Sequence, residues 1–373
     1  MKRLVLCCDG TWNRADQEHD GAPCPTNVVK LAYRVAKRDP AGTPQIIFYE
    51  QGVGTGNALD RFSGGAFGDG LEDNILDVYR FLVGNYEPGD EIFLFGFSRG
   101  AFTARSIVGM VRKCGILACK HARHYREALG LYRNGDRPAD PEPVRFRTRC
   151  CAYGDQSIQV RFMGVWDTVG ALGIPVRGLR ALKKKYEFHD TELSGMVDEA
   201  CHALAIDEHR APFAPALWED KVKEGQKVEQ VWFCGAHSDV GGGYERSRDG
   251  NGRLEAQLAD ISLDWMLGKA QGAGLELDPE VVEANPLVLE PLAMIHNSKT
   301  GFYRIVPEFD RLIGLATIDK VQTDKPDSTQ QLHPSVLARW DTDPKYRPEA
   351  LARYFKMKGD PRAEAGSGLG SPA

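Results

Sequence analysis

The segment "DEIFLFGFSRGAFTARSI", residues 90–107, runs from a short apolar stretch into a serine with glycine two positions before it and two positions after it. The apolar stretch 92–95 is continuous, which is typical of a strand buried on both faces of a sheet. Beyond Ser98, apolar side chains recur at helical spacing, and Gly115 follows where such a helix would end. The segment therefore predicts a buried strand, a tight turn at Ser98 and a helix.

A tight turn between a strand and a helix can present a serine hydroxyl for catalysis. It strains the backbone of the serine, lifts the hydroxyl clear of the sheet and directs the amide of the next residue, Arg99, towards a reacting oxygen. GxSxG is a short motif in a chain with 40 glycines, so the flanking strand and helix carry the argument. We predict that Ser98 is a nucleophile, and the alternative is a purely structural turn.

Further short apolar runs end abruptly in polar residues or glycine, and amphipathic stretches such as 71–86 lie between several of them. Continuous apolar strands that alternate with helices predict an α/β fold, with a mostly parallel central sheet and helices on both faces. In such sheets the functional groups gather at the carboxyl ends of the strands, so the residues that follow each run are the first candidates for a site. The further runs are 3–8, 45–49, 159–166 and 229–234.

The domain organisation predicted from these runs is a single catalytic domain over residues 1–359. Two long stretches, about 118–158 and 171–226, interrupt the alternation and are predicted to form helical caps over the cleft. The tail 360–373 is rich in Gly, Ala, Ser and Pro and is predicted to be disordered.

Composition narrows the class of protein. The chain has 373 residues and a formal net charge of −5, which argues against nucleic acid as a partner. Its nine cysteines form no CxxC or zinc-ligand pattern, so we predict reduced thiols, no metal and no cofactor. The first apolar run is too short for a signal peptide, and no stretch is long enough to span a membrane. We expect a cytoplasmic protein, or one exported without a cleaved signal peptide, and peripheral membrane contact stays open.

A nucleophilic serine needs a histidine base and an orienting carboxylate, here in the chain order Ser, acid, His. Among nine histidines, His237 is placed best, in a glycine-rich loop after an apolar run. Asp167 closes an earlier run and is favoured as the acid, with Asp207 and Asp239 as alternatives. Because Asp239 is placed to brace its own loop, Asp239→Asn is expected to lower the melting temperature, whereas Asp167→Asn is expected to leave it near the wild-type value.

An oxyanion hole needs two N–H donors. In this arrangement one comes from the residue after the serine, here Arg99, and the other from the loop after an earlier strand. The loop "DGTWN" directly follows the run 3–8, so the amide of Gly10 or Thr11 is predicted to be the second donor.

Two rival motifs are weaker. "DGT" after an apolar strand also occurs in phosphatases with an aspartyl nucleophile, but these need an aspartate two residues before Asp9, where this chain has Cys7. "GVGTGN", residues 52–57, is similar to a dinucleotide-binding loop, but its third glycine falls one residue early and no helix follows at once.

Six blocks occur along the chain in this order: "CCDGTWN", "YEQGVGTG", "GFSRGAFTAR", "VWDTVGALG", "FCGAHSDVGGGY" and "HNSKTGFYR". Together, from Lys2 to Tyr354, the chain resembles the α/β-hydrolase family that includes one class of type VI secretion lipase effectors. The resemblance implies an α/β-hydrolase fold, ester hydrolysis and a triad of Ser98, Asp167 and His237, with phospholipase activity in the effector members. We therefore expect a serine hydrolase of carboxylic esters, with acyl esters of glycerophospholipids as candidate substrates. The alternative is a non-catalytic binding or scaffold protein that retains the fold.

Overall fold

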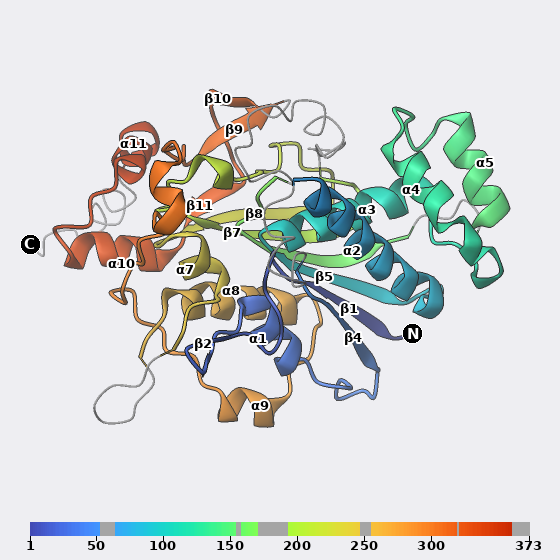
Figure 1. Cartoon of the computed structure of the whole chain (residues 1–373), viewed down its shortest axis with the longest axis horizontal. Coiled ribbons are helices and arrows are strands. Elements are labelled where there is room, and N and C mark those ends of the chain that lie inside the picture. The colour runs from blue at the N-terminus through green and yellow to red at the C-terminus, as the bar shows by residue number, and fades with distance from the viewer. Residues whose placement is uncertain (53–63, 154–157, 171–192, 247–254, 319–320, 360–373) are drawn as a thin grey trace, which may run out of the picture.

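Seven parallel strands form the central sheet in the part of the chain that the structure describes (Figure 1). The structure is a computed structural model, and it describes residues 1–52, 64–153, 158–170, 193–246, 255–318 and 321–359. The strand order is β11-β8-β7-β6-β5-β1-β4, which places β5 and β6 in the interior of the sheet. The strands are β1 (Arg3–Cys8), β4 (Gln45–Glu50), β5 (Glu91–Phe97), β6 (Val160–Trp166), β7 (Val197–Ala205), β8 (Lys227–Phe233) and β11 (Gln330–Leu332).

The predicted fold class is confirmed, since the sheet is parallel and carries helices on both faces. Strands β1, β4, β5, β6 and β8 lie within two residues of the apolar runs that predict them. Strand β7 is a correction, because it lies inside the stretch 171–226 that was predicted to be a cap. Its sequence "VDEACHALA" has two acidic residues, Asp198 and Glu199, near its start, so it does not have the continuous apolar pattern that the prediction relied on. The earlier part of that stretch, 171–192, lies outside the described residues.

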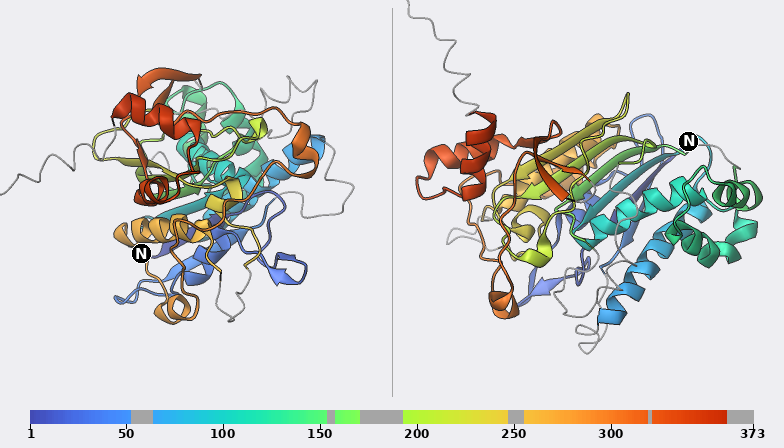
Figure 2. Two further views of the ribbon diagram at one scale, coloured as in Figure 1. Left: turned by 90° about the vertical axis from the view of Figure 1, so that its left-hand side faces the viewer. Right: turned by 90° about the horizontal axis from the view of Figure 1, so that it is seen from above.

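Two helix layers cover the sheet (Figures 1 and 2). On one face, α2 (Gly64–Asn85) and α3 (Arg99–Cys114) pack through a single apolar cluster that also includes side chains of β1, β5 and β6. On the other face, α1 (Asn27–Arg34) and α8 (Leu258–Gly272) pack against the same strands through a second cluster. Because both faces are covered, the interior strands β1, β5 and β6 are apolar beyond their first residues, as expected of a parallel sheet.

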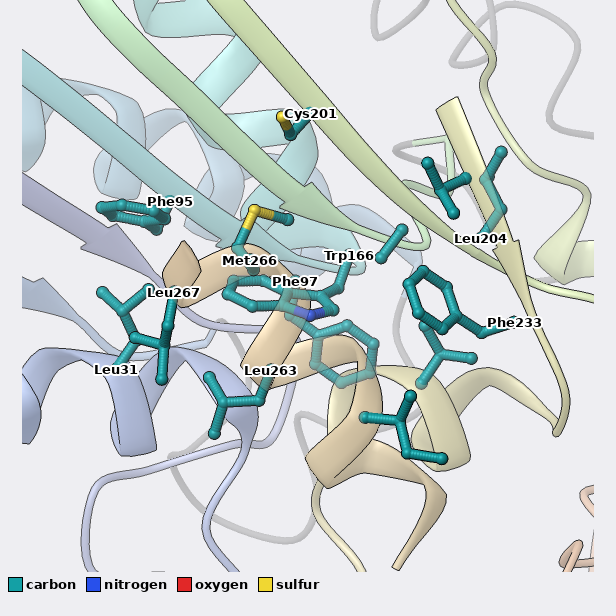
Figure 3. Close-up of a cluster of buried hydrophobic side chains, with 14 of the residues drawn as sticks. Leu31, Phe95, Phe97, Trp166, Cys201, Leu204, Phe233, Leu263, Met266 and Leu267 are labelled. Atoms are coloured by element: carbon teal, nitrogen blue, oxygen red, sulfur yellow. The ribbon is translucent and has the colours of Figure 1, made fainter. Parts of the chain in front are cut away.

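The second cluster holds the carboxyl end of β5 in place. Figure 3 shows Met266 and Leu267 of α8, and Leu31 of α1, beside Phe95 and Phe97 of β5. All five side chains are buried. Burial of each side chain of this size stabilises the fold by about 1.5–3 kcal/mol. The strand end from which Ser98 follows is therefore a rigid part of the molecule.

The described residues of the insertion 118–158 lie away from the carboxyl ends of the strands. The insertion follows the end of α3, and α3 runs back from Ser98 towards the amino ends (Figure 1). Its helices η2 (Cys119–His124), α4 (Tyr125–Arg133) and α5 (Pro141–Cys150) pack on α2 and α3, and Tyr153 donates a hydrogen bond to the carbonyl of Tyr86 beyond α2. The described part of this insertion is therefore not a cap over the cleft, which corrects the prediction.

The last part of the described chain extends the sheet at the β8 edge (Figure 1). Here β9 (Leu315–Ile318) and β10 (Val321–Pro326) form an antiparallel pair, and α10 (Pro334–Thr342) and α11 (Glu349–Lys358) follow β11. None of the helices in the described ranges is long and apolar enough to cross a membrane. The predicted disordered tail, 360–373, lies outside these ranges. The remaining elements are β2 (Glu18–His19), β3 (Ala22–Pro23), η3 (Ala211–Phe213), α7 (His237–Gly241), α9 (Pro279–Ala284) and η4 (Gly301–Ile305).

The glycines around Ser98 are required by close backbone contacts. A Cβ on Gly96 would lie 2.6 Å from the Cα of Ala101, in the next helix. A Cβ on Gly100 would overlap the carbonyl oxygens of Cys8 and Asp9, at the end of β1. The turn after β5 and the loop after β1 are therefore packed against each other directly, backbone on backbone.

This contact predicts a large effect of Gly100→Ala on stability. The methyl group would meet two fixed carbonyl oxygens, so we expect the free energy of unfolding to fall by about 2–3 kcal/mol. Urea unfolding followed by circular dichroism measures the change. Gly84→Ala in α2 is the matched control, because a Cβ there meets no atom within 4 Å and the stability should not fall. Equal urea midpoints for Gly100→Ala and the wild type would contradict the close packing.

Candidate active site

Three strand ends bring Ser98, Asp167 and His237 together. Ser98 lies between β5 and α3, Asp167 directly follows β6, and His237 is the first residue of α7, after β8. The Oγ of Ser98 lies 2.8 Å from Nε2 of His237, and Nδ1 of His237 lies 2.6 Å from Oδ2 of Asp167. The three side chains form one hydrogen-bonded chain, and all three are buried.

The backbone at two of these positions is strained. Ser98 has φ +58° and ψ −121°, and Asp167 has φ +38°, which are conformations that residues other than glycine rarely adopt. Each such residue costs about 1–3 kcal/mol and persists only where the surrounding structure holds it. Strand pairing supplies that support, because the amide of Ser98 donates to the carbonyl of Trp166 and the amide of Asp167 donates to the carbonyl of Ala203. The strain raises the Ser98 hydroxyl out of the strand and towards His237.

Aromatic rings fix the plane of the His237 imidazole. The Phe97 ring lies 4.6 Å from it in a tilted arrangement, and the Phe213 ring lies 4.9 Å from it edge-on. Gly241 makes room for Phe97, since a Cβ there would overlap the phenyl ring. Burial in this apolar setting lowers the pKa of His237 below its usual 6.5, although the hydrogen bond and the charge of Asp167 oppose the shift. The imidazole is thus held neutral and in one orientation.

Two groups besides His237 hold Asp167. Its Oδ1 accepts from the amide of Ala205 at 3.1 Å, and both carboxylate oxygens accept from the guanidinium of Arg311. Burial alone would raise the pKa of Asp167, but the charge of Arg311 and the hydrogen bonds from His237 and Arg311 outweigh it and hold that pKa well below its usual range. Asp167 is therefore ionised at neutral pH.

The two alternative acids have other partners. Asp239 accepts from the amide of Ala236 at 2.9 Å, and its carboxylate contacts the ring and the amide of His296 at 2.6 and 3.0 Å. Asp207 accepts from the amide of Gly235 and from the hydroxyl of Tyr346. Both carboxylates brace the loop that leads into α7, and the structure places Asp167 rather than either of them against the His237 ring.

A second ion pair lies beside His237. Glu208 accepts two side-chain hydrogen bonds from Arg210, at 2.8 and 2.7 Å, and a longer one from the amide of His237 at 3.3 Å. The Arg210 guanidinium also lies 3.6 Å from the centre of the Phe213 ring, in a cation–π arrangement. Sequence reasoning missed this pair and also Arg311, because neither belongs to a motif with a known spacing.

The loop after β1 lies directly against Ser98. A Cβ on Gly10 would be 3.1 Å from the Cβ of Ser98, and the amide of Gly10 donates to Oδ1 of Asp9 at 2.7 Å. Burial raises the pKa of Asp9 to about 6, against hydrogen bonds from Thr26 and Tyr49 that lower it. The buried Oγ1 of Thr11 has no hydrogen-bond partner among the described residues.

Two backbone segments adjoin Ser98. One is the loop with Gly10 and Thr11, and the other is the first turn of α3, which begins at Arg99. The first N–H groups of a helix have no partner within the helix, and they lie at its positive end. Within the described ranges, no group of three or more His, Cys, Asp or Glu side chains could hold a metal ion.

A parallel sheet with a serine at a strained strand-to-helix turn, hydrogen-bonded to a histidine from a later strand, defines an α/β-hydrolase-like architecture. Residues 2–269 match the model of the T6SS phospholipase effector Tle1-like catalytic domain, and the chain belongs to this family. The family supports hydrolase activity of the lipase or esterase type. The matched residues end before the block "HNSKTGFYR", so the family match is shorter than the resemblance predicted from Lys2 to Tyr354.

Individual relatives give less information. The chain is 28% identical over 232 residues to the uncharacterized protein YEL023C of Saccharomyces cerevisiae, a match that covers 57% of this chain and 32% of the yeast protein. A crystal structure of an uncharacterized protein from Pseudomonas aeruginosa is 17% identical, with a TM-score of 0.43, over 77% of this chain and 49% of that one. The chain thus spans less than half the length of either relative.

Proposed function

We propose that the protein is a serine hydrolase of carboxylic esters and that acyl esters of glycerophospholipids are among its substrates. The observation that carries the proposal is the hydrogen-bonded chain from Ser98 Oγ through His237 to Asp167, at 2.8 and 2.6 Å, with the serine on a strained turn. These distances are within the range expected of a nucleophile, a general base and the residue that orients the base.

In the first half of the reaction, the Ser98 oxygen attacks the acyl carbonyl carbon while Nε2 of His237 takes the hydroxyl proton. Asp167 holds the imidazole in the tautomer with the proton on Nδ1 and stabilises the imidazolium as it forms. The tetrahedral intermediate then collapses, His237 gives its proton to the oxygen of the leaving alcohol, and the acyl group remains on Ser98.

In the second half, water takes the place of the alcohol. His237 removes a proton from the water, the hydroxide attacks the acyl-enzyme carbonyl, and the proton on His237 returns to Ser98 as the free acid leaves. No metal or organic cofactor takes part in this sequence.

The oxyanion that forms in both halves needs two donors. We assign them to the backbone amides of Arg99, at the start of α3, and of Thr11, in the loop after β1. The Gly10 amide donates to Asp9, which favours Thr11 over Gly10 as the second donor. The buried Thr11 hydroxyl, which has no hydrogen-bond partner among the described residues, adds a second polar group to this loop. Each such donor is worth about 2.7–4 kcal/mol in other serine hydrolases.

Family membership supports a lipid ester as the substrate, since the matching family consists of phospholipase catalytic domains. Such a substrate lies in a membrane or micelle, so the protein would contact a lipid surface peripherally. A panel of p-nitrophenyl esters of increasing chain length, assayed beside phospholipid vesicles, compares soluble and lipid esters directly.

A fluorophosphonate probe tests the chemistry. The probe phosphonylates an activated serine, so we expect labelling of the folded protein at Ser98, identified by peptide mass spectrometry. Ester hydrolysis should disappear as labelling becomes complete. If the folded protein is not labelled at Ser98 and hydrolyses no ester, it is a binding protein that retains the fold.

The pH dependence follows from His237. Only the neutral imidazole can accept the serine proton, and burial lowers the pKa of His237 below 6.5. The value of kcat/KM should therefore stay constant down to about pH 6.5 and fall below it, as the imidazole becomes protonated. Stopped-assay rates with a p-nitrophenyl ester between pH 4.5 and 8.5 give the profile. If the fall in kcat/KM had its midpoint above pH 7, the pKa of His237 would not be lowered by burial.

A further inference from the structure

We infer that Arg311 is a positioning residue of the active site: it fixes Asp167 in line with His237 and thereby controls the acid side of the pH–rate profile. The inference rests on the proposed function. Arg311 lies between η4 and β9, beyond residues 2–269 that match the family model. A segment outside the matched domain thus supplies part of the site.

The contact between the Arg311 guanidinium and the Asp167 carboxylate is bidentate. Nη1 lies 2.5 Å from Oδ1, and Nη2 lies 2.9 Å from Oδ2, and both side chains are fully buried. A planar guanidinium that meets both oxygens of a carboxylate fixes the plane of that carboxylate as well as its position. The plane matters here, because Oδ2 must also point at Nδ1 of His237.

Arg311 is itself anchored to two backbone elements. Its Nη1 donates to the carbonyl of Ala205, at the end of β7, and its Nη2 donates to the carbonyl of Phe213, in η3, both at 2.8 Å. Phe213 carries the ring that packs edge-on against His237. The guanidinium therefore ties Asp167 to the same framework that fixes the imidazole.

Arg311 also reduces the charge that Asp167 presents to His237. Oδ2 accepts from both His237 and Arg311, so the negative charge is shared between an imidazole and a permanent cation. In an Asp–His pair without such a cation, the full charge would favour the imidazolium and raise the pKa of the histidine. With Arg311 in place, the burial of His237 prevails and its pKa stays low.

The other charged groups around the pair do not substitute for this cation. Glu208 and Arg210 act on His237 in opposite directions and are paired with each other. His202 of β7 also faces Asp167, but burial, followed by the charge of Arg105, lowers its pKa to about 3, so it is uncharged. Within the described residues, Arg311 is the permanent cation that contacts the Asp167 carboxylate.

The same C-terminal segment contacts the site at two further points. His296 contacts Asp239, and the Ser298 hydroxyl donates to Glu208 at 3.2 Å. Both carboxylates lie next to the backbone of α7, which carries His237. Arg311 is the member of this segment that reaches the triad itself, so it is the one to test.

The experiment compares Arg311→Lys and Arg311→Gln with the wild type. Arg311→Lys keeps the positive charge but loses the bidentate contact with the carboxylate. We therefore expect kcat to fall about 10–100-fold, with little change in KM or in the acid limb, the low-pH side of the pH–rate profile. Arg311→Gln loses the charge too, so its acid limb should move up by about one pH unit. Arg147→Gln is the control, since Arg147 is also buried, donates to the backbone carbonyls of Lys113 and Pro138 away from the site, and its loss should leave the profile unchanged.

A second readout does not depend on turnover. NMR titration of histidine-labelled protein, with His237 assigned through His237→Asn, should show a higher His237 pKa in Arg311→Gln than in the wild type. An unchanged titration and an unchanged acid limb would overturn the inference, even if the variant is slower. If the wild type shows no Ser98 labelling, the proposed function fails, and the titration still decides the effect of Arg311 on His237.

The double variant Asp167→Asn with Arg311→Gln covers the case in which Arg311→Gln does not fold. It removes both charges of the buried pair together, which is tolerated far better than the removal of one partner. Compared with Asp167→Asn alone, the further loss of Arg311 should leave the His237 titration unchanged, because the carboxylate through which it acts is absent. A shift of the same size in this background would show that Arg311 acts on His237 without Asp167 and would overturn the positioning role.

Discussion

Ser98→Ala is expected to lower the turnover of p-nitrophenyl esters by about 10⁴–10⁶-fold and to abolish fluorophosphonate labelling. The Ser98 oxygen is the atom that His237 Nε2 contacts at 2.8 Å, and no acyl-enzyme can form without it. A small residual rate is expected, because the oxyanion donors and the binding surface would still act on a water molecule.

The stability of this variant should stay close to that of the wild type. Alanine has the same Cβ as serine, so the backbone strain at φ +58° is unchanged, and only one hydrogen bond to His237 is lost. Ser106→Ala is the matched control, since Ser106 is also buried and lies in α3, the helix that begins directly after Ser98. It should keep both labelling and turnover. Full turnover by Ser98→Ala would assign the nucleophile elsewhere and remove the basis of the proposed mechanism.

The local part of this site could be predicted from the sequence. The apolar run before Ser98, the two glycines around it and the helical pattern after it are all short-range signals, and each corresponds to an element of the structure. The same holds for Asp167, which directly follows an apolar run, and for His237, which follows one after two further residues. In a parallel sheet, residues at the ends of neighbouring strands meet at one edge, so the order of the runs sufficed to bring them together.

Elements without a continuous apolar pattern were missed. Strand β7 pairs with both β6 and β8 along its length, yet Asp198 and Glu199 near its start hide it from an analysis of apolar runs. The helices of the insertion 118–158 were expected over the cleft because insertions in this fold often lie there. Their position is set by the direction of α3, which the sequence pattern does not reveal.

The supporting polar groups were missed for a different reason. Arg311 lies 144 residues from Asp167 in the chain, and no local pattern relates the two. Likewise, Asp239 was assigned to its own loop correctly, through the amide of Ala236, but its contact with His296 crosses 57 residues. Such partners are determined by tertiary packing, so a single sequence gives no signal for them.

Arg311 changes the prediction for Asp167→Asn. With only the sequence, this variant was expected to keep the wild-type melting temperature, since no partner other than His237 was evident. In the structure, the substitution leaves the Arg311 guanidinium buried without its carboxylate. Removal of one partner of a buried ion pair destabilises a protein by about 3–5 kcal/mol, so we now expect a clear loss of stability.

The kinetic loss should be large as well. An amide at position 167 can neither fix the imidazole tautomer nor stabilise the imidazolium, and we expect ester turnover to fall by about 10²–10⁴-fold. Asp239→Asn is the comparison, because Asp239 braces the loop before α7 without contact to the His237 ring. It should be destabilised too, with a smaller kinetic defect. If Asp239→Asn were the less active of the two, the acid of the triad would be Asp239.

The pH dependence separates the ion pair from a simple loss of packing. The folded pKa of Asp167 lies below its usual 3.8, so its stabilising contribution is complete above about pH 4 and is lost as the pH falls towards the folded value. The difference in unfolding free energy between the wild type and Asp167→Asn should therefore shrink as the pH falls from about 4 to 3. Urea unfolding at each pH measures it. A difference that stays the same at pH 3 would mean that the charge of Asp167 does not stabilise the fold, and that Arg311 is held by its carbonyl contacts alone.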